Sequence, residues 1–286
     1  MSTERSDERA SATATAIRAT GNRALIGYLP VGFPDQATCV DAVVALADAG
    51  FTAVELGVPY SDPGMDGPVI QAATQATLER GFRLEELFET IEAIAARTDI
   101  PVLVMTYWNP VLRYGIDRFA ERFAAAGGAG LITPDLTPEN AADWLAAAER
   151  HDLDRIFLAA PSSSGARLDA VIEASRGFVY TVSTMGTTGT RADVDQSARA
   201  LADRIAARSG ELGLETLRCV GVGISTSDHV RQVVDYADGA IVGSALVRAL
   251  GDGGVPALRE LAASLALGTL DGGPATPAPA EKGIPA

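Results

Sequence analysis

The chain has 286 residues, 47% of them hydrophobic, and a formal net charge of −14. That is enough apolar sequence for one large core or two small ones, and no run of it reaches membrane length. Because no signal pattern opens the chain and its charges are scattered, we expect a soluble cytoplasmic protein that binds neither nucleic acid nor anionic membranes.

Short apolar runs typical of strands alternate with longer segments of helical periodicity from about residue 24 to residue 249. The helical periodicity is clearest at 38–49, 83–96 and 116–126. The eight strand-like runs lie at 24–29, 52–58, 101–106, 130–133, 155–160, 177–182, 218–222 and 239–242. Eight strand–helix units in one unbroken body predict an α/β fold, a single-domain (β/α)8 TIM barrel, rather than an open doubly wound sheet.

The two ends of the chain differ from this body. Residues 1–10 are polar and are expected to form a mobile N-terminus, followed at 11–20 by an extra helix that covers the bottom of the barrel. The catalytic barrel domain is predicted to span 11–267. From 268 to 286 the composition shifts to Gly, Pro and Ala, which predicts a disordered C-terminal tail.

Polar and aromatic side chains gather where predicted strands end. They follow the first, second, third, fourth and sixth strands and include Tyr28, Tyr107, Asn109 and Asp135. In such a barrel the loops at the carboxyl ends of the strands carry the chemistry. A purely structural barrel needs turns there but has no need for aromatic, amide or acidic groups, so this rim is the candidate site.

The strongest single signal is the segment 54–68, in which one carboxylate, Glu55, interrupts a run of strand formers. The run then breaks into a loop that contains two further acids, Asp62 and Asp66. Burying an unpaired carboxylate costs roughly several kcal/mol, and it raises the pKa toward the value that a general acid–base needs near neutral pH. The alternative is a salt-bridged structural glutamate beside an ordinary surface loop.

Composition restricts the chemistry further. The only lysine is Lys282, in the predicted tail, so the folded body offers no amine for a Schiff base or for covalently held pyridoxal phosphate. The two histidines, His151 and His229, are too few for a metal held by several imidazoles, and Cys39 and Cys219 lack metal-ligand spacing. We therefore expect no metal and no cofactor in this chain, with carboxylates and perhaps tyrosines transferring protons.

The seventh and eighth strands end in glycine-rich turns. The seventh leads into Gly223 and Ser225, and the eighth into Gly243 and Ser244 at the start of a helix. Glycines let backbone amides approach a ligand, and a helix N-terminus favours an anion, so these loops predict a phosphate site. Neither loop contains Lys or Arg. The alternative is a pair of tight turns and an N-cap serine.

Several blocks, in the right order and at matching spacing, resemble the tryptophan synthase alpha subunit family from about residue 18 to residue 250. They are ELGVPYSDP at 55–63, DGP at 66–68 with IQ at 70–71, MTYWNP at 105–110, PDL at 134–136, GFVY at 177–180, GIS at 223–225 and VGSA at 242–245. The resemblance implies a barrel enzyme that cleaves indole-3-glycerol phosphate to indole and glyceraldehyde 3-phosphate. It also implies a beta subunit, which carries pyridoxal phosphate and receives the indole within an alpha2beta2 assembly.

By the same resemblance, Glu55 is the acid–base group and Asp66 faces the indole N–H. The remaining substrate-binding positions that it implies are Tyr28, Tyr107 and Tyr180 in the pocket, Thr188 in a mobile lid that touches Asp66, and Gly189, Gly223, Gly243 and Ser244 at the phosphate. The surface of the partner would meet the rim loops at Pro59, Asp62, Asn109 and Pro110.

The cleavage is a retro-aldol step, which needs an electron sink and the removal of a hydroxyl proton. Indole can itself be the sink, because protonation at ring carbon C3 gives a C=N⁺ group. A buried acid over C3 fits Glu55, and a fixed carboxylate at the ring N–H fits Asp66, because positive charge develops there. The base that takes the hydroxyl proton stays open between Glu55, a tyrosine and water.

A few departures from the family pattern leave the implied catalytic groups in place. Thr187 stands where the lid commonly has Val, and Val222 stands where Phe is common, which widens the indole pocket. Ala129 replaces an acid often found before the fourth strand. Gly64 and Met65 replace other apolar residues in the loop after the second strand.

Three alternatives remain at this stage. A stand-alone lyase would use the same residues without a partner. A catalytically silent barrel would bind phosphorylated ligands or activate a partner, but it would not need both Glu55 and Asp66. Another phosphate-binding barrel enzyme, such as a sugar-phosphate epimerase with a metal site, would need histidine ligands on its strands, and the sequence has none there.

Overall fold

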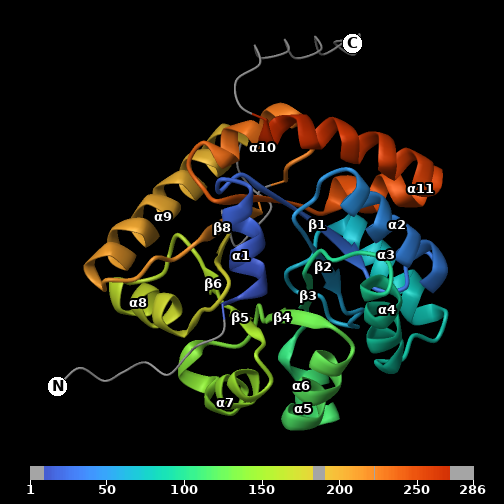
Figure 1. The fold of residues 1–286 in the computed structure, drawn as a ribbon, viewed down its shortest axis with the longest axis horizontal. Helices are drawn as coiled ribbons and strands as arrows, with labels where there is room; N and C mark the ends of the chain where they lie inside the picture. Colours follow the sequence, from blue (N-terminus) through green and yellow to red (C-terminus); the bar gives the residue numbers. More distant parts are fainter. Residues whose placement is uncertain (1–9, 183–190, 222, 271–286) are drawn as a thin grey trace.

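The computed structural model describes residues 10–182, 191–221 and 223–270, in which parallel strands form a barrel ringed by helices (Figure 1). The strands are β1 (Ala24–Pro30), β2 (Ala53–Gly57), β3 (Val102–Met105), β4 (Gly128–Ile132), β5 (Asp154–Ile156), β6 (Leu158–Ala159), β7 (Val179–Val182), β8 (Arg218–Gly221) and β9 (Gly239–Val242). They pair in parallel in the order β5-β4-β3-β2-β1-β9-β8-β7-β6.

The two ends of this strand order are consecutive pieces of the chain. β5 pairs with β4, β6 pairs with β7, and Phe157 alone separates β5 from β6. The predicted strand 155–160 is therefore a strand that changes neighbour at Phe157, whose carbonyl accepts a hydrogen bond from the Tyr180 amide (3.0 Å). This switch brings the sheet round into a nearly closed barrel, and the predicted (β/α)8 fold is confirmed.

Helices cover the outside of the barrel. They are α2 (Gln36–Asp48), α3 (Pro68–Glu79), α4 (Glu85–Ala95), α5 (Trp108–Tyr114), α6 (Ile116–Ala125), α7 (Ala142–Arg150), α8 (Gly165–Ala174), α9 (Arg191–Glu211), α10 (Ser227–Val234) and α11 (Ser244–Ala266). Short polar side chains start several of them: Asp35 accepts from the Thr38 amide (2.9 Å), and Thr226 accepts from the His229 amide (3.2 Å). The helices predicted at 38–49, 83–96 and 116–126 correspond to α2, α4 and α6.

The inside of the barrel has an apolar layer near the amino ends of the strands. Ile26, Ala53, Leu103, Phe178 and other residues from alternate positions form this layer and are buried together. Because side chains in a strand alternate between the two faces, the residues two positions further along the strands also point inward. The apolar layer therefore sets which side chains line the next layer toward the carboxyl ends.

The predicted extra helix is α1 (Ala12–Ala19), and Figure 1 shows it at the centre of the ring of outer helices. Its residues Ala14 and Ile17 belong to the apolar layer inside the barrel, so α1 closes the amino end. Asp154, at the start of β5, is 1% exposed and binds the start of this helix. Its Oδ2 accepts hydrogen bonds from Ser11 Oγ (2.8 Å) and from the Thr13 amide (3.3 Å). Arg176 lies on the other side of the carboxylate, with Nε 3.6 Å from Oδ1.

At the other end of the chain, a short 3-10 turn, η2 (Leu267–Thr269), follows α11. Gly268 is buried, and Arg23 Nε donates to the Thr269 carbonyl (2.8 Å), so this turn is joined to the segment before β1. The remaining predicted tail and the predicted N-terminus, except Ala10, lie outside the described residues. In the part that is described, no helix combines the length and the apolar character needed to cross a membrane.

Candidate active site

Glu55 lies inside the barrel, one layer above the apolar layer. It is two positions after Ala53 on β2, beside Tyr28 on β1 and Leu103 on β3 in the strand register. The residue is 0% exposed, and within residues 10–182, 191–221 and 223–270 neither carboxylate oxygen has a hydrogen-bond partner. This burial raises the pKa of Glu55 to about 8. The carboxyl group therefore holds its proton at neutral pH and can donate it.

Asp66 lies in the loop between β2 and α3 and is half-buried. Burial raises the pKa of this carboxyl group to about 6, so at neutral pH it is mainly ionised. The loop fixes its backbone, because the Asp66 carbonyl accepts from Gln71 Nε2 (2.8 Å) and the following residues Gly67 and Pro68 open α3. The two acids thus differ in charge state at the same pH, as an acid and an electrostatic partner must.

Tyr28 and Tyr180 occupy the same interior layer as Glu55. Each lies two positions after a residue of the apolar layer, Ile26 on β1 and Phe178 before β7. Burial is the largest cause that raises the pKa of both phenols well above the usual value, and the negative charges of Glu55 and Asp66 add to it. Both hydroxyls therefore stay protonated at neutral pH, close enough to the two acids for their charges to act on the phenols.

Two glycines make room for these phenols. A Cβ atom at Gly57 would collide with the hydroxyl of Tyr28, and a Cβ atom at Gly221 would lie 2.7 Å from that of Tyr180. A larger residue at either position would push a phenol out of the pocket. The sequence analysis named neither glycine as a site residue, because this close approach exists only after β2 and β8 have packed beside their neighbours.

Contacts between loops link the rim above Glu55. Tyr107, after β3, accepts a hydrogen bond from the Met65 amide at its hydroxyl (2.9 Å) and stacks on Tyr60, with ring centroids 4.9 Å apart. Asp135, after β4, accepts from the Trp108 amide at the start of α5 (2.8 and 3.1 Å). The loops after β2, β3 and β4 therefore support one another, and Tyr60 is a supporting residue that the sequence analysis missed.

The predicted phosphate loops lie next to Tyr28. A Cβ atom at Gly243, the residue before α11, would lie 3.5 Å from Tyr28 Cδ1, and Ser244 begins the helix. Gly223, after β8, has a φ of 61°, which only glycine adopts easily. Thr188 and Gly189 lie outside the described residues. Gly243 is thus linked to Glu55 through Tyr28, which lies beside Glu55 in the strand register.

His229 supports the loop after β8, a contact that the sequence analysis did not anticipate. Its Nδ1 lies 3.3 Å from the Ser225 amide nitrogen, which donates to it, and 3.4 Å from Ser225 Oγ. This geometry places the proton of the neutral ring on Nε2. A histidine four residues after a serine is a weak signal in sequence, because most such pairs do not meet across a helix start.

The four residues implied at a partner interface have different exposure. Asp62 and Asn109 are exposed and Pro110 is half-buried, whereas Pro59 is buried and offers little surface. Two large apolar side chains near them, Met65 and Leu112, are 38% and 52% exposed. Among the described residues, no group of three or more His, Cys, Asp or Glu side chains is placed to hold a metal ion.

The fold is a (β/α)8 barrel, and inside its carboxyl rim it holds a protonated carboxylic acid, an ionised second acid and two phenols, the groups that acid–base chemistry uses. A family model described as tryptophan synthase alpha chain matches residues 14–266. The chain belongs to this family of lyases of tryptophan biosynthesis.

Relatives and solved structures agree with this assignment. The alpha chain of Leifsonia xyli is 62% identical over 249 residues, which cover 87% of this chain and 94% of the relative. That of Mycobacterium tuberculosis is 54% identical over 252 residues, 88% of this chain and 90% of the relative. A crystal structure of tryptophan synthase from M. tuberculosis in an aminoacrylate-bound form superposes with a TM-score of 0.83 at 49% identity, covering 91% of this chain and 100% of that one. The tryptophan synthase complex from Pyrococcus furiosus gives a TM-score of 0.76 at 31% identity, covering 85% and 97%.

Proposed function

We propose that this chain cleaves indole-3-glycerol phosphate to indole and glyceraldehyde 3-phosphate and passes the indole to a beta subunit. The observation that carries the proposal is Glu55, which is fully buried, has a pKa of about 8 and has no hydrogen-bond partner in the described part of the chain. A group in that state costs stability, and carboxyl groups with pKa values raised toward neutral pH cluster at catalytic sites.

In the proposed reaction, Glu55 gives its proton to C3 of the indole ring. The ring nitrogen becomes positively charged, and the ionised Asp66 stabilises this charge by accepting the N–H. The bond between C3 and the glycerol chain then breaks, its electron pair returns to the ring, and the neighbouring hydroxyl loses its proton as it becomes the aldehyde. Glu55, now a carboxylate, is in the right protonation state to receive that proton, which restores the starting form.

Binding in this proposal divides between two ends of the pocket. Tyr28 and Tyr180 flank the reacting carbon, and Tyr107 holds the loop that carries Asp66. The amides at Gly223, Gly243 and Ser244 would hold the phosphate, with Thr188 and Gly189 of the lid completing the site. We propose no cofactor for this chain; pyridoxal phosphate would be on the beta subunit alone.

The proposed partner surface is the carboxyl rim of the barrel, and the proposed assembly is alpha2beta2 in the cytoplasm. Two solved structures that resemble this chain, from M. tuberculosis and P. furiosus, are described as tryptophan synthase and as a tryptophan synthase complex. Asp62, Asn109 and Pro110, together with the exposed Met65 and Leu112, provide polar and apolar surface on this rim. Pro59 would act through the shape of the loop, because its side chain is buried.

The test is an assay of indole release from indole-3-glycerol phosphate by the purified chain, alone and with a tryptophan synthase beta subunit. We expect slow release by the chain alone, a sharp rise with the partner, and loss of activity in Glu55→Gln. Fast release that the partner does not change would instead support a stand-alone lyase. No indole under any condition would contradict the enzymatic proposal and leave a barrel that only binds or activates.

A further inference from the structure

Tyr28 leans across the inside of the barrel from one neighbouring strand to the other. On one side its ring lies beside Gly243, after β9, where a Cβ atom would be 3.5 Å from Tyr28 Cδ1 and 3.6 Å from Tyr28 Cβ. On the other side its hydroxyl lies over Gly57 on β2, in the place that a side chain at position 57 would occupy. The phenol therefore reaches from the proposed phosphate loop to the strand that carries Glu55.

The geometry of β2 relates this hydroxyl to Glu55. Side chains two residues apart in a strand point to the same face, with their Cα atoms about 7 Å apart along the strand. Because Ala53 and Glu55 point into the barrel, the place of the missing side chain at Gly57 is also inside it, one step nearer the carboxyl rim. The Tyr28 hydroxyl thus lies one level above the acid, toward the rim.

This hydroxyl has a hydrogen bond still to make. Tyr28 is 6% exposed, and among the described residues none donates a hydrogen bond to its hydroxyl or accepts one from it. Tyr107 differs, because its hydroxyl accepts from the Met65 amide (2.9 Å). Tyr180 leans over Gly221 on β8, away from β2. A nearly buried polar group without a partner costs free energy, and a ligand that pairs with it recovers that cost.

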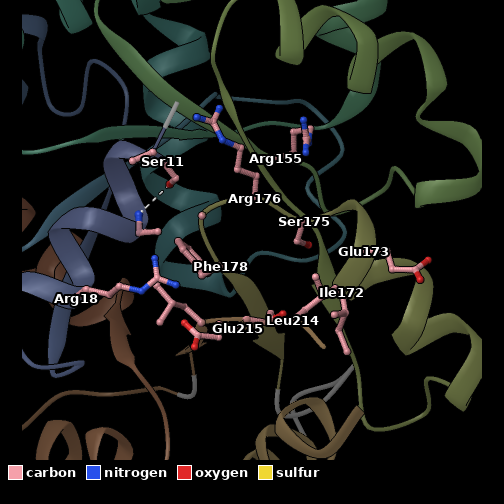
Figure 2. A pocket seen from close by; sticks show the side chains of 15 residues that line it. Ser11, Arg18, Arg155, Ile172, Glu173, Ser175, Arg176, Phe178, Leu214 and Glu215 are labelled. Carbon is pink, nitrogen blue, oxygen red and sulfur yellow. Dashed lines mark hydrogen bonds between the residues drawn. The ribbon is translucent and has the colours of Figure 1, made fainter. Parts of the chain in front are cut away.

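The pocket at the amino end of the barrel is a contrasting case (Figure 2). It has a volume of about 340 Å³, and Arg155 and Arg176 form part of its wall. Arg155 Nε donates to the Ala174 carbonyl (3.2 Å). Arg176 Nη2 lies 2.6 Å from a carboxylate oxygen of Asp152. These two cations join segments of the fold to one another, so they need no ligand, whereas the Tyr28 hydroxyl does.

The substrate of the proposed reaction would bring a hydroxyl to this point. In indole-3-glycerol phosphate, a chain of three carbons joins ring carbon C3 to the phosphate, and the two carbons nearer the ring carry hydroxyls. With the phosphate at Gly243 and the ring above Glu55, this chain would run along the phenol of Tyr28. The end of the phenol over β2 would then meet the hydroxyl nearest the ring, which is the one that becomes the aldehyde.

We propose that Tyr28 is a further catalytic residue, whose hydroxyl donates a hydrogen bond to the oxygen of this ring-adjacent hydroxyl group. The inference rests on the reaction proposed above. As the bond between C3 and the side chain breaks, its electron pair returns to the ring, the proton of the substrate hydroxyl passes to Glu55, and the oxygen becomes a carbonyl that still accepts from Tyr28. A fixed donor stabilises the negative charge that develops on this oxygen.

The surroundings of Tyr28 suit a donor that keeps its own proton. Burial, together with the charges of Asp66 and Glu55, raises the pKa of the phenol well above its usual value. The hydroxyl therefore stays protonated while the substrate oxygen loses its proton, and no proton needs to pass through Tyr28.

Tyr28→Phe, assayed in the complex with a tryptophan synthase beta subunit, tests the proposal because it removes the hydroxyl alone. We expect kcat/KM for indole release to fall roughly 10- to 100-fold, mainly through kcat, because the hydrogen bond strengthens in the transition state. The matched control is Tyr114→Phe. It removes a hydroxyl that donates to Glu85 (3.2 Å) between α5 and α4, and it should leave both kinetic constants unchanged.

Binding of 3-(indol-3-yl)propyl phosphate separates this role from a structural one. This analogue has the ring, the three-carbon chain and the phosphate but neither hydroxyl, so it cannot be cleaved. Calorimetry should give the same dissociation constant for the parent chain and for Tyr28→Phe, because the analogue has no oxygen for Tyr28 to bind. If its affinity fell by the same factor as kcat/KM, Tyr28 would only shape the pocket, and the proposal would be overturned.

The assay also distinguishes this inference from the proposed function. Indole release by the parent chain, at an unchanged rate in Tyr28→Phe, would overturn the role of Tyr28 and leave the proposed reaction standing. No release by the parent chain, alone or with the partner, would overturn the proposed function and the role of Tyr28 with it.

Discussion

Glu55 and Asp154 are carboxylates in strands of the same barrel, 0% and 1% exposed. They lie at opposite ends of it: Glu55 faces the carboxyl rim, whereas Asp154 lies beneath α1 at the amino end. Asp154 accepts hydrogen bonds from Ser11 and from the Thr13 amide and lies beside Arg176. Glu55 has no hydrogen-bond partner in the part of the chain that the structure describes.

The difference shows how surroundings decide what a buried carboxylate does. The hydrogen bonds and the ion pair of Asp154 join α1, β5 and the segment before β7. Without such groups Glu55 holds its proton until the pH reaches about 8. The first arrangement supports the fold, and the second costs stability but keeps a proton available for chemistry. Changing each group in turn should separate these two roles.

The largest effect is expected for Glu55→Gln. This variant keeps the shape of the side chain but removes the transferable proton, so indole release should fall by roughly 10³- to 10⁴-fold. Single-turnover release of indole measures it, with Glu89→Gln on α4 as the matched control. The thermal midpoint of Glu55→Gln should equal or exceed that of the parent chain. A clear loss of stability would mean that Glu55 has a structural role after all.

Asp154→Ala should affect folding instead. It removes the acceptor of Ser11 and Thr13 and leaves Arg176 without its buried partner, so the free energy of unfolding should fall by roughly 3–5 kcal/mol. Urea denaturation measures the change. Asp152→Ala, which removes the exposed partner of the same arginine, should cost less than about 1 kcal/mol. If the two variants lost the same free energy of unfolding, the burial of Asp154 would not be the reason for its contribution to stability.

The pH dependence of stability should also distinguish Glu55. Its pKa of about 8 in the folded chain lies above the ordinary value of 4.5, so the native state binds a proton more tightly than the unfolded state. The contribution to stability is complete below pH 4.5 and disappears as the pH rises to 8. Between pH 5 and pH 8 the parent chain should lose roughly 3 kcal/mol relative to Glu55→Gln. A difference that stays constant with pH would argue against a protonated Glu55.

Asp66→Asn should slow the reaction without changing the fold. The amide cannot stabilise a positive ring nitrogen as a carboxylate does, so kcat should fall roughly 10²-fold. Steady-state kinetics measures this, with Glu121→Gln on α6 as the control for loss of one negative charge. If Asp66→Asn retained full activity, the electrostatic role proposed for Asp66 would be wrong.

The smallest effect is expected in the loop after β8. His229→Leu removes the acceptor of the Ser225 amide, which should raise KM roughly five-fold with little change in kcat. His229→Asn places a carbonyl oxygen near the position of Nδ1 and should restore KM. A similar KM in both variants and in the parent chain would show that this hydrogen bond does not support phosphate binding.

Much of the architecture could be predicted because it depends on local patterns. Alternating apolar runs and helical segments set the number and order of the strands, and the predicted helix at 11–20 is α1. The strand at 155–160 was predicted as one unit, but its division at Phe157 could not be, because it reflects a change of neighbour rather than any property of the residues. Thr188 and Gly189, outside the described residues, remain predictions.

The sequence predicted the residues of the candidate site, but it did not predict the contacts that hold those residues in place. Glu55 is recognisable because a carboxylate in an apolar strand is unusual, whereas Tyr60 on Tyr107 and His229 on the Ser225 amide are contacts between side chains and loops that sequence spacing does not define. Nothing in the sequence around Asp154 predicted its structural role. An aspartate at the start of a strand is common, and its value lies in what packs around it.

The sequence by itself determined the barrel and the end of the barrel that carries polar groups, and it pointed to the two acids for which a catalytic role is proposed. These depend on the period of the apolar residues and on which residues are present or absent. Only the tertiary structure decided which buried carboxylate is paired and which stays protonated. The pKa depends on desolvation and on charges within a few ångströms, and those distances exist only once strands remote in sequence stand side by side.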